Sequence, residues 1–343
     1  MKRASPSLAS AAALAPQSRR ALLRLVAAAG LAPSALLGAA QAESADYPQK
    51  PLRLIVPFAV GGAVTFLVEQ VVSQMEPELG QPVLRDYRGG AGGTLALELA
   101  AAAPHDGYTL FVLSTSAAIS AGVYPNLKAD IVRDFEPVVL LATTPYALVI
   151  HPGVPARNVQ ELVAFGRANP GKLTVAVSGI GNSDDIVAHE FSRLTGVPLL
   201  HVPFRGAGPA VSELVAGRCN VSFFSPLPTK AFVEEGRLRL LGVTTRQRSS
   251  ALPNVPSIAE QGVPDFDYPG WYGLAVPTGT PAPIVAQLQR ATAAALAKPA
   301  VRDYLLGNGL APGGGPSAEF KAFVASETAR WSGLARSLGI KPE

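Results

Sequence analysis

Cysteine is almost absent from this sequence, and its single copy excludes an intramolecular disulfide. Cys219 lies in the strand-like run CNVSFF, which favours a buried inert thiol over a nucleophile. Histidine is also scarce: the four histidines, at 105, 151, 189 and 201, show no metal-ligand spacing, and no acidic cluster accompanies them. We therefore expect no metal site and no thiol chemistry.

Motifs of nucleotide-binding and catalytic proteins are missing as well. The segment RGGAGG (88–93) lacks the GxGxxG spacing of a dinucleotide site, and no ribose-binding acid is suitably placed downstream. There is no GxSxG nucleophile elbow and no Walker lysine. We expect His105 to lie in a solvated turn rather than to act as a catalytic base. We expect His189 to lie at the surface or between the lobes. No credible nucleophile–base pair is left, so we expect a protein that is not an enzyme. We also expect no cofactor. An exported hydrolase is the weakest alternative.

Acidic residues are absent from the first 42 positions, which carry five basic ones: Lys2, Arg3, Arg19, Arg20 and Arg24. This charged start, the mildly apolar run LVAAAGLAPSALLGAAQA and its AQA ending predict an export signal at 1–42, cleaved after Ala42. The segment SRRALLR (18–24) resembles a twin-arginine signal, and an ordinary secretory signal with two adjacent arginines is the alternative. We expect a periplasmic protein.

Removal of the signal changes the charge of the chain. Without those five basic residues, the 29 basic side chains fall to 24 against 25 acidic ones, a formal charge of −1. A nucleic-acid partner then loses its compositional support.

Short apolar strands alternate with amphipathic helices, a pattern that predicts α/β structure with parallel sheets and helices on both faces. The strand–helix pattern continues to about residue 146 and then begins again in a second part. Near the end, the chain returns to the first part. Expected strands are 52–56, 82–87, 108–113, 172–177, 199–204, 219–224, 238–245 and 271–277. Expected helices are 64–79, 94–102 with Thr94 as N-cap, 158–168, 184–195, 209–216, 229–235, 283–298 and 317–338. We therefore predict two lobes, 43–146 with 247–343 and 147–246, each a mixed, mostly parallel sheet flanked by helices, and a ligand cleft between them.

Four loops that follow predicted strands have the chemistry to hold one anionic ligand. Small residues allow the backbone to approach the ligand closely. Helix N-termini supply partial positive charge, and hydroxyl groups add hydrogen-bond donors. Glycines after strands also commonly serve only to make the turn. The four loops contain Gly61 and Gly62; Ser114, Thr115 and Ser116; Gly181, Asn182 and Ser183; and Arg205-Gly206 or Ser225.

From about Tyr47 to the C-terminus the chain resembles the periplasmic substrate-binding proteins of tripartite tricarboxylate transporters, the Bug family. The resemblance is carried by YPQKPLRLIVPFAVGG (47–62), RGGAGG (88–93), PHDGYTL (104–110), HVPFRGAGPAVSELVAGRCNVSFF (201–224), LRLLGVTTRQRSSALPNVPSIAEQG (238–262) and WYGLAVPTGTPAPIVAQL (271–288). It implies a two-lobed Venus-flytrap protein of the type II periplasmic class. It also implies a small carboxylate held by backbone amides and waters, and delivery to a membrane permease.

The resemblance implies a set of ligand-binding residues. Phe58 would wall the pocket. The remaining residues of the implied site are Ala59, Gly61, Gly62, Thr65, Ser114, Thr115 and Ser116 in the first lobe, and Gly181, Asn182, Ser183, Asp185, Phe204 and Ser225 in the second.

Three positions depart from the family pattern. Thr65 replaces a common aspartate, Asn182-Ser183-Asp184-Asp185 replaces a Thr or Ser followed by His, and Ser225 follows Phe224 where Asp is frequent. The lost acids argue against an α-amino acid ligand. Asp184 and Asp185 either cap helix 184–195 or, if Asp185 faces the pocket, disfavour a polyanion such as citrate.

The expected function is therefore capture of a small organic carboxylate for a membrane permease by a monomeric periplasmic protein. A periplasmic sensor that presents its ligand to a signalling partner is the alternative.

Overall fold

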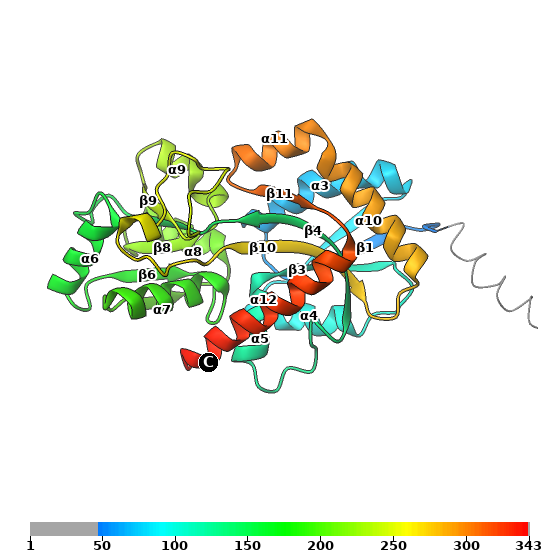
Figure 1. The fold of residues 1–343 in the computed structure, drawn as a ribbon, viewed down its shortest axis with the longest axis horizontal. Helices are drawn as coiled ribbons and strands as arrows, with labels where there is room; N and C mark the ends of the chain where they lie inside the picture. Colours follow the sequence, from blue (N-terminus) through cyan, green and yellow to red (C-terminus); the bar gives the residue numbers. More distant parts are fainter. Residues whose placement is uncertain (1–46, 342–343) are drawn as a thin grey trace, which may run out of the picture. The chain divides into compact units, whose positions relative to one another are not determined.

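The computed structural model describes residues 47–341, so the predicted signal at 1–42 lies outside the described part. From Pro48 onward the chain forms one compact unit. It contains two β-sheets, each flanked by helices (Figure 1). We call the six-stranded sheet and its helices the first lobe, and the five-stranded sheet and its helices the second lobe.

The first lobe has the strand order β11-β4-β10-β3-β1-β2. Its strands are β1 (Leu52–Val56), β2 (Val83–Tyr87), β3 (Thr109–Ser114), β4 (Phe135–Thr144), β10 (Gly270–Pro277) and β11 (Ala311–Gly314). Its helices are α3 (Ala63–Leu79), α4 (Thr94–Ala101), α5 (Thr115–Val123), α10 (Ala282–Ala297), α11 (Pro299–Gly307) and α12 (Ser317–Ser337). Helix α3 packs with α10 and α11 on one face, and α12 packs with α5 on the other (Figure 1).

The second lobe has the strand order β7-β6-β8-β5-β9. Its strands are β5 (Ala147–Ile150), β6 (Thr174–Val177), β7 (Leu200–Pro203), β8 (Val221–Phe224) and β9 (Arg239–Val243). Its helices are α6 (Val159–Ala168), α7 (Ser183–Thr195), α8 (Ala207–Val215) and the short α9 (Lys230–Glu234). Single-turn 3₁₀ segments occur at Ala91–Gly93, Leu227–Thr229 and Ala259–Gln261.

Buried apolar residues account for these elements. Strands β3 and β5 are apolar on both faces because helices cover both sides of the sheets. Helix α3 buries Val64, Leu67, Val68, Val71 and Met75, which recur at helical spacing, and it ends at Gly80 in the left-handed conformation. Helix α6 begins where the Asn158 side chain accepts a hydrogen bond from the Glu161 N–H at 2.8 Å.

Two chain segments connect the lobes and are hydrogen-bonded to one another. The first passes from β4 through Pro145 and Tyr146 into β5, and the second returns from β9 to β10. Thr244 joins them: its Oγ1 accepts from the Tyr146 N–H (2.9 Å) and donates to the Tyr268 carbonyl (2.8 Å). We call Tyr146, Thr244 and Tyr268 the crossing cluster.

The described fold confirms the two-lobed α/β prediction and differs from it in detail. The sheets are mixed as predicted, but only four of the nine strand pairs are parallel, so they are not mostly parallel. The reason is that the strands on which the chain enters and leaves the second lobe, β5 and β10, each run antiparallel to both their neighbours, and β11 runs antiparallel to β4. The N-cap of α4 is Gly93 rather than Thr94, which is already helical. Helix α11 and strand β11 were not predicted, since APGG lacks apolar alternation. Within the described part, no helix has the length and apolar character needed to span a membrane.

Candidate functional site

A cavity of about 70 Å³ lies between the lobes. At about 10–15 Å³ for each water molecule, it has room for roughly five waters, which suits a small organic molecule. Residues of both lobes line it: Phe58, Ala59, Gly62, Ala63, Val64, Ser114, Thr115, Ser116, Tyr146, Ser178, Ser183, Asp184, Gly206, Ala207, Phe224, Ser225, Pro228, Trp271 and Tyr272.

Four helix N-termini converge on this cavity. Helices α3 and α5 contribute their first residues from the first lobe, and α7 and α8 contribute theirs from the second. None of the four N-cap residues, Gly62, Ser114, Asn182 and Gly206, makes a side-chain cap to its own helix. Because an N-terminus carries partial positive charge and unpaired N–H groups, this convergence creates a site for an anion.

Full basic charges play no part in the cavity wall. None of the lining residues, all within the described part, is Lys, Arg or His. The wall is instead mostly aromatic and hydroxyl-bearing. Burial raises the pKa of the Tyr146 and Tyr272 phenols well above their ordinary value, so both stay neutral hydrogen-bond donors.

Two buried donors in the wall have no hydrogen-bond partner among the described residues. They are the Ser114 hydroxyl and the Trp271 indole N–H. Their side chains belong to residues that are 2% and 1% exposed. An unpaired buried polar group costs about 1–3 kcal/mol, which a bound ligand or water would recover.

One acidic side chain, Asp184, lines the cavity. Its Oδ2 accepts from the Ser178 N–H at 2.5 Å, and its Oδ1 accepts from the Ser178 hydroxyl at 2.6 Å. Burial raises the pKa of Asp184 to about 7, and the Ser178 hydrogen bonds oppose this rise only in part. The site therefore combines positive helix ends with one carboxyl group that ionises near neutral pH.

The lobes touch across the cavity. The Ser183 N–H donates to the Ser116 hydroxyl at 3.4 Å, and the two hydroxyl oxygens lie 3.5 Å apart. A Cβ placed on Gly62 would lie 4.0 Å from the Cβ of Ala207. The N-terminus of α5 thus meets that of α7, and the N-terminus of α3 faces that of α8.

The structure brings eight of the sequence-predicted residues into the cavity wall: Phe58, Ala59, Gly62, Ser114, Thr115, Ser116, Ser183 and Ser225. Six others are not in the wall: Gly61, Thr65, Gly181, Asn182, Asp185 and Phe204.

Four of these six form two matching loop supports. The Thr65 hydroxyl accepts from the Gly61 N–H at 3.2 Å, and the Asp185 Oδ2 accepts from the Gly181 N–H at 2.8 Å. In each pair the acceptor follows the glycine by four residues. Both glycines have positive φ, +102° and +74°, which favours glycine at these positions. Thr65 and Asp185 therefore fix the loops that lead to the wall residues Gly62 and Ser183.

The remaining two residues also stabilise the second-lobe loops. The Asn182 side-chain amide donates to the Ser178 hydroxyl at 3.1 Å, and the Phe204 N–H donates to the Val177 carbonyl at 2.9 Å. The acid that faces the cavity is Asp184 rather than Asp185. The expected charge repulsion against a polyanion applies to Asp184 instead.

Sequence reasoning missed Tyr146, which lies in the connection from β4 to β5, and Trp271 and Tyr272, which lie at the start of β10. The only signal for Trp271 and Tyr272 was their place in the motif WYGLAVP, and Tyr146 carried none. Ser178, Asp184 and Gly206 lie within loops that were singled out, but other residues of those loops were preferred.

Comparison with known proteins places this geometry in a family. Residues 67–340 match the family described as "Tripartite tricarboxylate transporter family receptor". The protein BugT of Bordetella pertussis is 31% identical over 323 residues, which cover 93% of this chain and 99% of BugT.

Two solved structures resemble this chain closely. Rpa4515 of R. palustris, solved with adipate, has a TM-score of 0.83 and 32% identity, over 87% of this chain and all of Rpa4515. MatC (Rpa3494) of Rhodopseudomonas palustris, solved with bound malate, has a TM-score of 0.79 and 30% identity, over 84% of this chain and all of MatC.

Proposed function

Since the chain belongs to the tripartite tricarboxylate transporter receptor family, as the sequence predicted, we propose that it captures a small organic carboxylate in the interlobe cavity and delivers it to a membrane permease. The family consists of receptors rather than enzymes, which confirms the expectation of a non-catalytic protein. The convergence of four helix N-termini on the cavity is the observation that carries the proposal.

The donors of the cavity suit a carboxylate. Each helix N-terminus stabilises a nearby negative charge by about 0.3–1 kcal/mol, and more when it is partly buried. The unpartnered Ser114 hydroxyl and Trp271 N–H supply further donors. Backbone and hydroxyl donors would bind the anion without an ion pair, in keeping with the backbone recognition that the family resemblance implies.

The cavity wall also restricts the rest of the ligand. Phe58, Phe224 and Trp271 offer apolar surface to a carbon skeleton, aliphatic or aromatic. Ionised Asp184 would repel a second carboxylate placed beside it, at about 3 kcal/mol for charges 5 Å apart in an effective dielectric of about 20. We therefore expect a ligand whose carboxylate lies at the N-termini of α3, α5 and α8 and away from Asp184, the second residue of α7.

Closure of the lobes would couple binding to delivery. We propose that the chain passes from one lobe to the other at residues 146/147 and 246/247, beside the crossing cluster. Ligand contacts from both lobes would then favour the closed form. The closed form would then dock on the permease in the periplasm, after cleavage behind Ala42. N-terminal sequencing of exported protein tests that cleavage site.

A thermal-shift screen of the purified protein tests the proposed function. Mono-, di- and tricarboxylates, aromatic acids and amino acids are compared; a ligand at 100 times its Kd adds about 2.7 kcal/mol, which raises the melting temperature by several degrees. Gly62→Val should abolish the shift, because its methyl groups would enter the cavity while its φ of −87° suits valine.

Gly333→Val in α12 is the matched control, since a Cβ there meets nothing within 4 Å, and it should preserve the shift. A screen without any shift, or a shift that survives Gly62→Val, would refute the assignment and favour the signalling alternative.

A further inference from the structure

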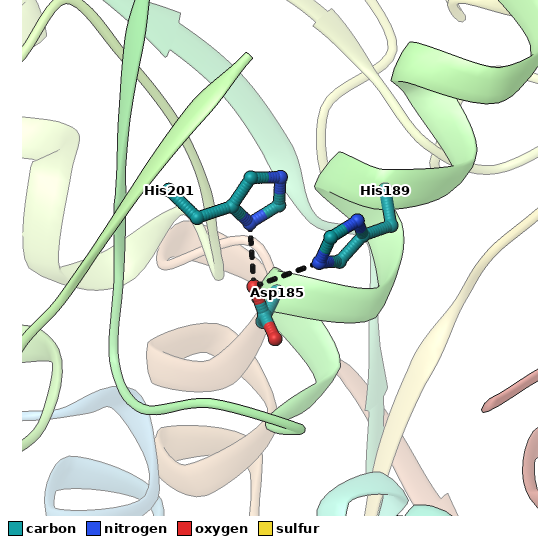
Figure 2. A group of neighbouring side chains, drawn as sticks. All are labelled: Asp185, His189 and His201. Carbon is teal, nitrogen blue, oxygen red and sulfur yellow. Dashed lines mark hydrogen bonds and ion pairs between the residues drawn. The ribbon is translucent and has the colours of Figure 1, made fainter. Parts of the chain in front are cut away.

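A second group of polar side chains lies outside the cavity. Asp185, His189 and His201 converge so that one ligand-type atom of each lies within 4.8 Å of the others (Figure 2). The Asp185 Oδ1 is 2.6 Å from the His201 Nδ1 and 3.6 Å from the His189 Nε2. Two of the four histidines of the chain thus point at one carboxylate oxygen.

The fold of the second lobe creates this cluster. Asp185 and His189 are four residues apart on α7 and so share one face of the helix. His201 lies on β7, an edge strand of the five-stranded sheet. The sequence did not reveal the group, because its third member comes from a separate element.

The Asp185 carboxylate is buried and already oriented. Its Oδ2 accepts from the Gly181 N–H, so Oδ1 alone is directed toward the two histidines. Asp185 is 2% exposed at its side chain, whereas His189 and His201 are 37% and 18% exposed. Carboxylates that bind metal ions are commonly fixed by such an outer hydrogen bond, and here the two imidazoles are partly exposed.

The two imidazole rings stack, with centroids 3.8 Å apart and an interplanar angle of 19°. Each ring turns one nitrogen toward Asp185, and these two nitrogens and the carboxylate oxygen lie within 4.8 Å of one another, as the ligands of one ion must.

We propose that Asp185, His189 and His201 bind one divalent transition-metal ion such as Zn²⁺ or Ni²⁺. Two imidazole nitrogens and one carboxylate oxygen match the ligands that these ions prefer, and a single oxygen donor is too few for Ca²⁺ or Mg²⁺. The exposed side of the cluster leaves a fourth coordination position to water.

Only small movements are required. With metal–ligand bonds of about 2.0–2.1 Å, ligand atoms in a tetrahedral site lie about 3.3 Å apart. The Asp185–His201 contact must therefore lengthen from 2.6 Å, while the Asp185–His189 contact at 3.6 Å is already close. The rings must also turn out of their stack, and His189, which is more exposed, has the freedom to do so.

Calorimetric titration of untagged, EDTA-treated full-chain protein with ZnCl₂ and NiCl₂ tests the proposal. One ion per chain is expected, and CoCl₂ should give the visible absorption of a tetrahedral site. His189→Ala should weaken binding by at least the 10–100-fold typical for loss of a supporting residue. His105→Ala removes an exposed histidine elsewhere and should leave the affinity unchanged.

Asp185→Asn separates ligation from folding, because the amide oxygen still accepts from Gly181 while the negative ligand is lost. It should weaken metal binding at least as much as His189→Ala does, with an unchanged circular dichroism spectrum. Absence of stoichiometric binding of all three ions, or binding that neither variant weakens, would overturn the proposal. The experiment contains no carboxylate ligand, so its result is independent of the proposed transport function.

Discussion

Replacement of Asp184 by Asn should remove a pH dependence from the stability of the ligand-free protein. Asp184 lies in the cavity wall, where burial raises its pKa from 3.8 to about 7. The folded state therefore retains a proton on this carboxyl between pH 4 and pH 7, while the unfolded state has lost it. Because the folded state binds more protons, stability falls as the pH rises through this interval.

The expected size follows from the two pKa values. Each pKa unit corresponds to about 1.36 kcal/mol, so the full effect is about 4 kcal/mol above pH 7, of which about 2 kcal/mol is lost between pH 5 and pH 7. Asn imitates the protonated acid: its oxygen accepts from the Ser178 N–H, and its amide donates to the Ser178 hydroxyl. Asp184→Asn should therefore lack this loss.

Urea unfolding at pH 5 and pH 7, with EDTA and without carboxylate ligands, measures the difference. Other titrating groups contribute to both proteins, so the comparison isolates Asp184. Asp303→Asn, at an exposed position of α11, is the matched control and should keep the wild-type dependence. Equal pH dependence in wild type and Asp184→Asn would refute the reasoning, as would a wild type that gains stability toward pH 7 relative to the variant.

Three other substitutions test separate parts of the structure. Ser114→Ala removes a buried hydroxyl without a partner; it should lower the affinity for the carboxylate by about tenfold without loss of stability, measured by calorimetry and thermal melting. Gly273→Ala should destabilise the first lobe by about 1–3 kcal/mol or more, because the new Cβ would lie 2.0 Å from the Phe320 ring; urea unfolding measures this, and unchanged stability would contradict it. Asn158→Ala removes the N-cap of α6 and should cost about 1 kcal/mol in the same assay, whereas Asn158→Asp should cost little.

Most helices and strands follow from local pattern. The run LRLIV predicted β1 without error, and the apolar spacing of 64–79 and 317–338 located α3 and α12 within a residue or two. These segments bury one face or both, so their periodicity is strong. Helix α5 was not predicted, because the run STSAAIS reads equally well as a polar loop.

The site was only half predictable for a physical reason. Glycines and hydroxyls after strands reveal where helices begin, and those helix ends form the wall. The aromatic residues Tyr146, Trp271 and Tyr272 come from where the chain leaves the first lobe and from the strand on which it returns, and their positions depend on the whole fold. Thr65 and Asp185 were expected to contact the ligand, and the sequence does not distinguish that role from support of the Gly61 and Gly181 amides.

The most direct test of the central claim is a calorimetric titration of the best carboxylate from the screen beside its neutral carboxamide analogue. If the N-termini of α3, α5 and α8 hold the anion, each by about 0.5 kcal/mol, the carboxylate should bind in a 1:1 complex at least about tenfold more tightly than the amide. Equal affinity for the two compounds would contradict the account, because the cavity would then recognise the carbon skeleton and not the charge.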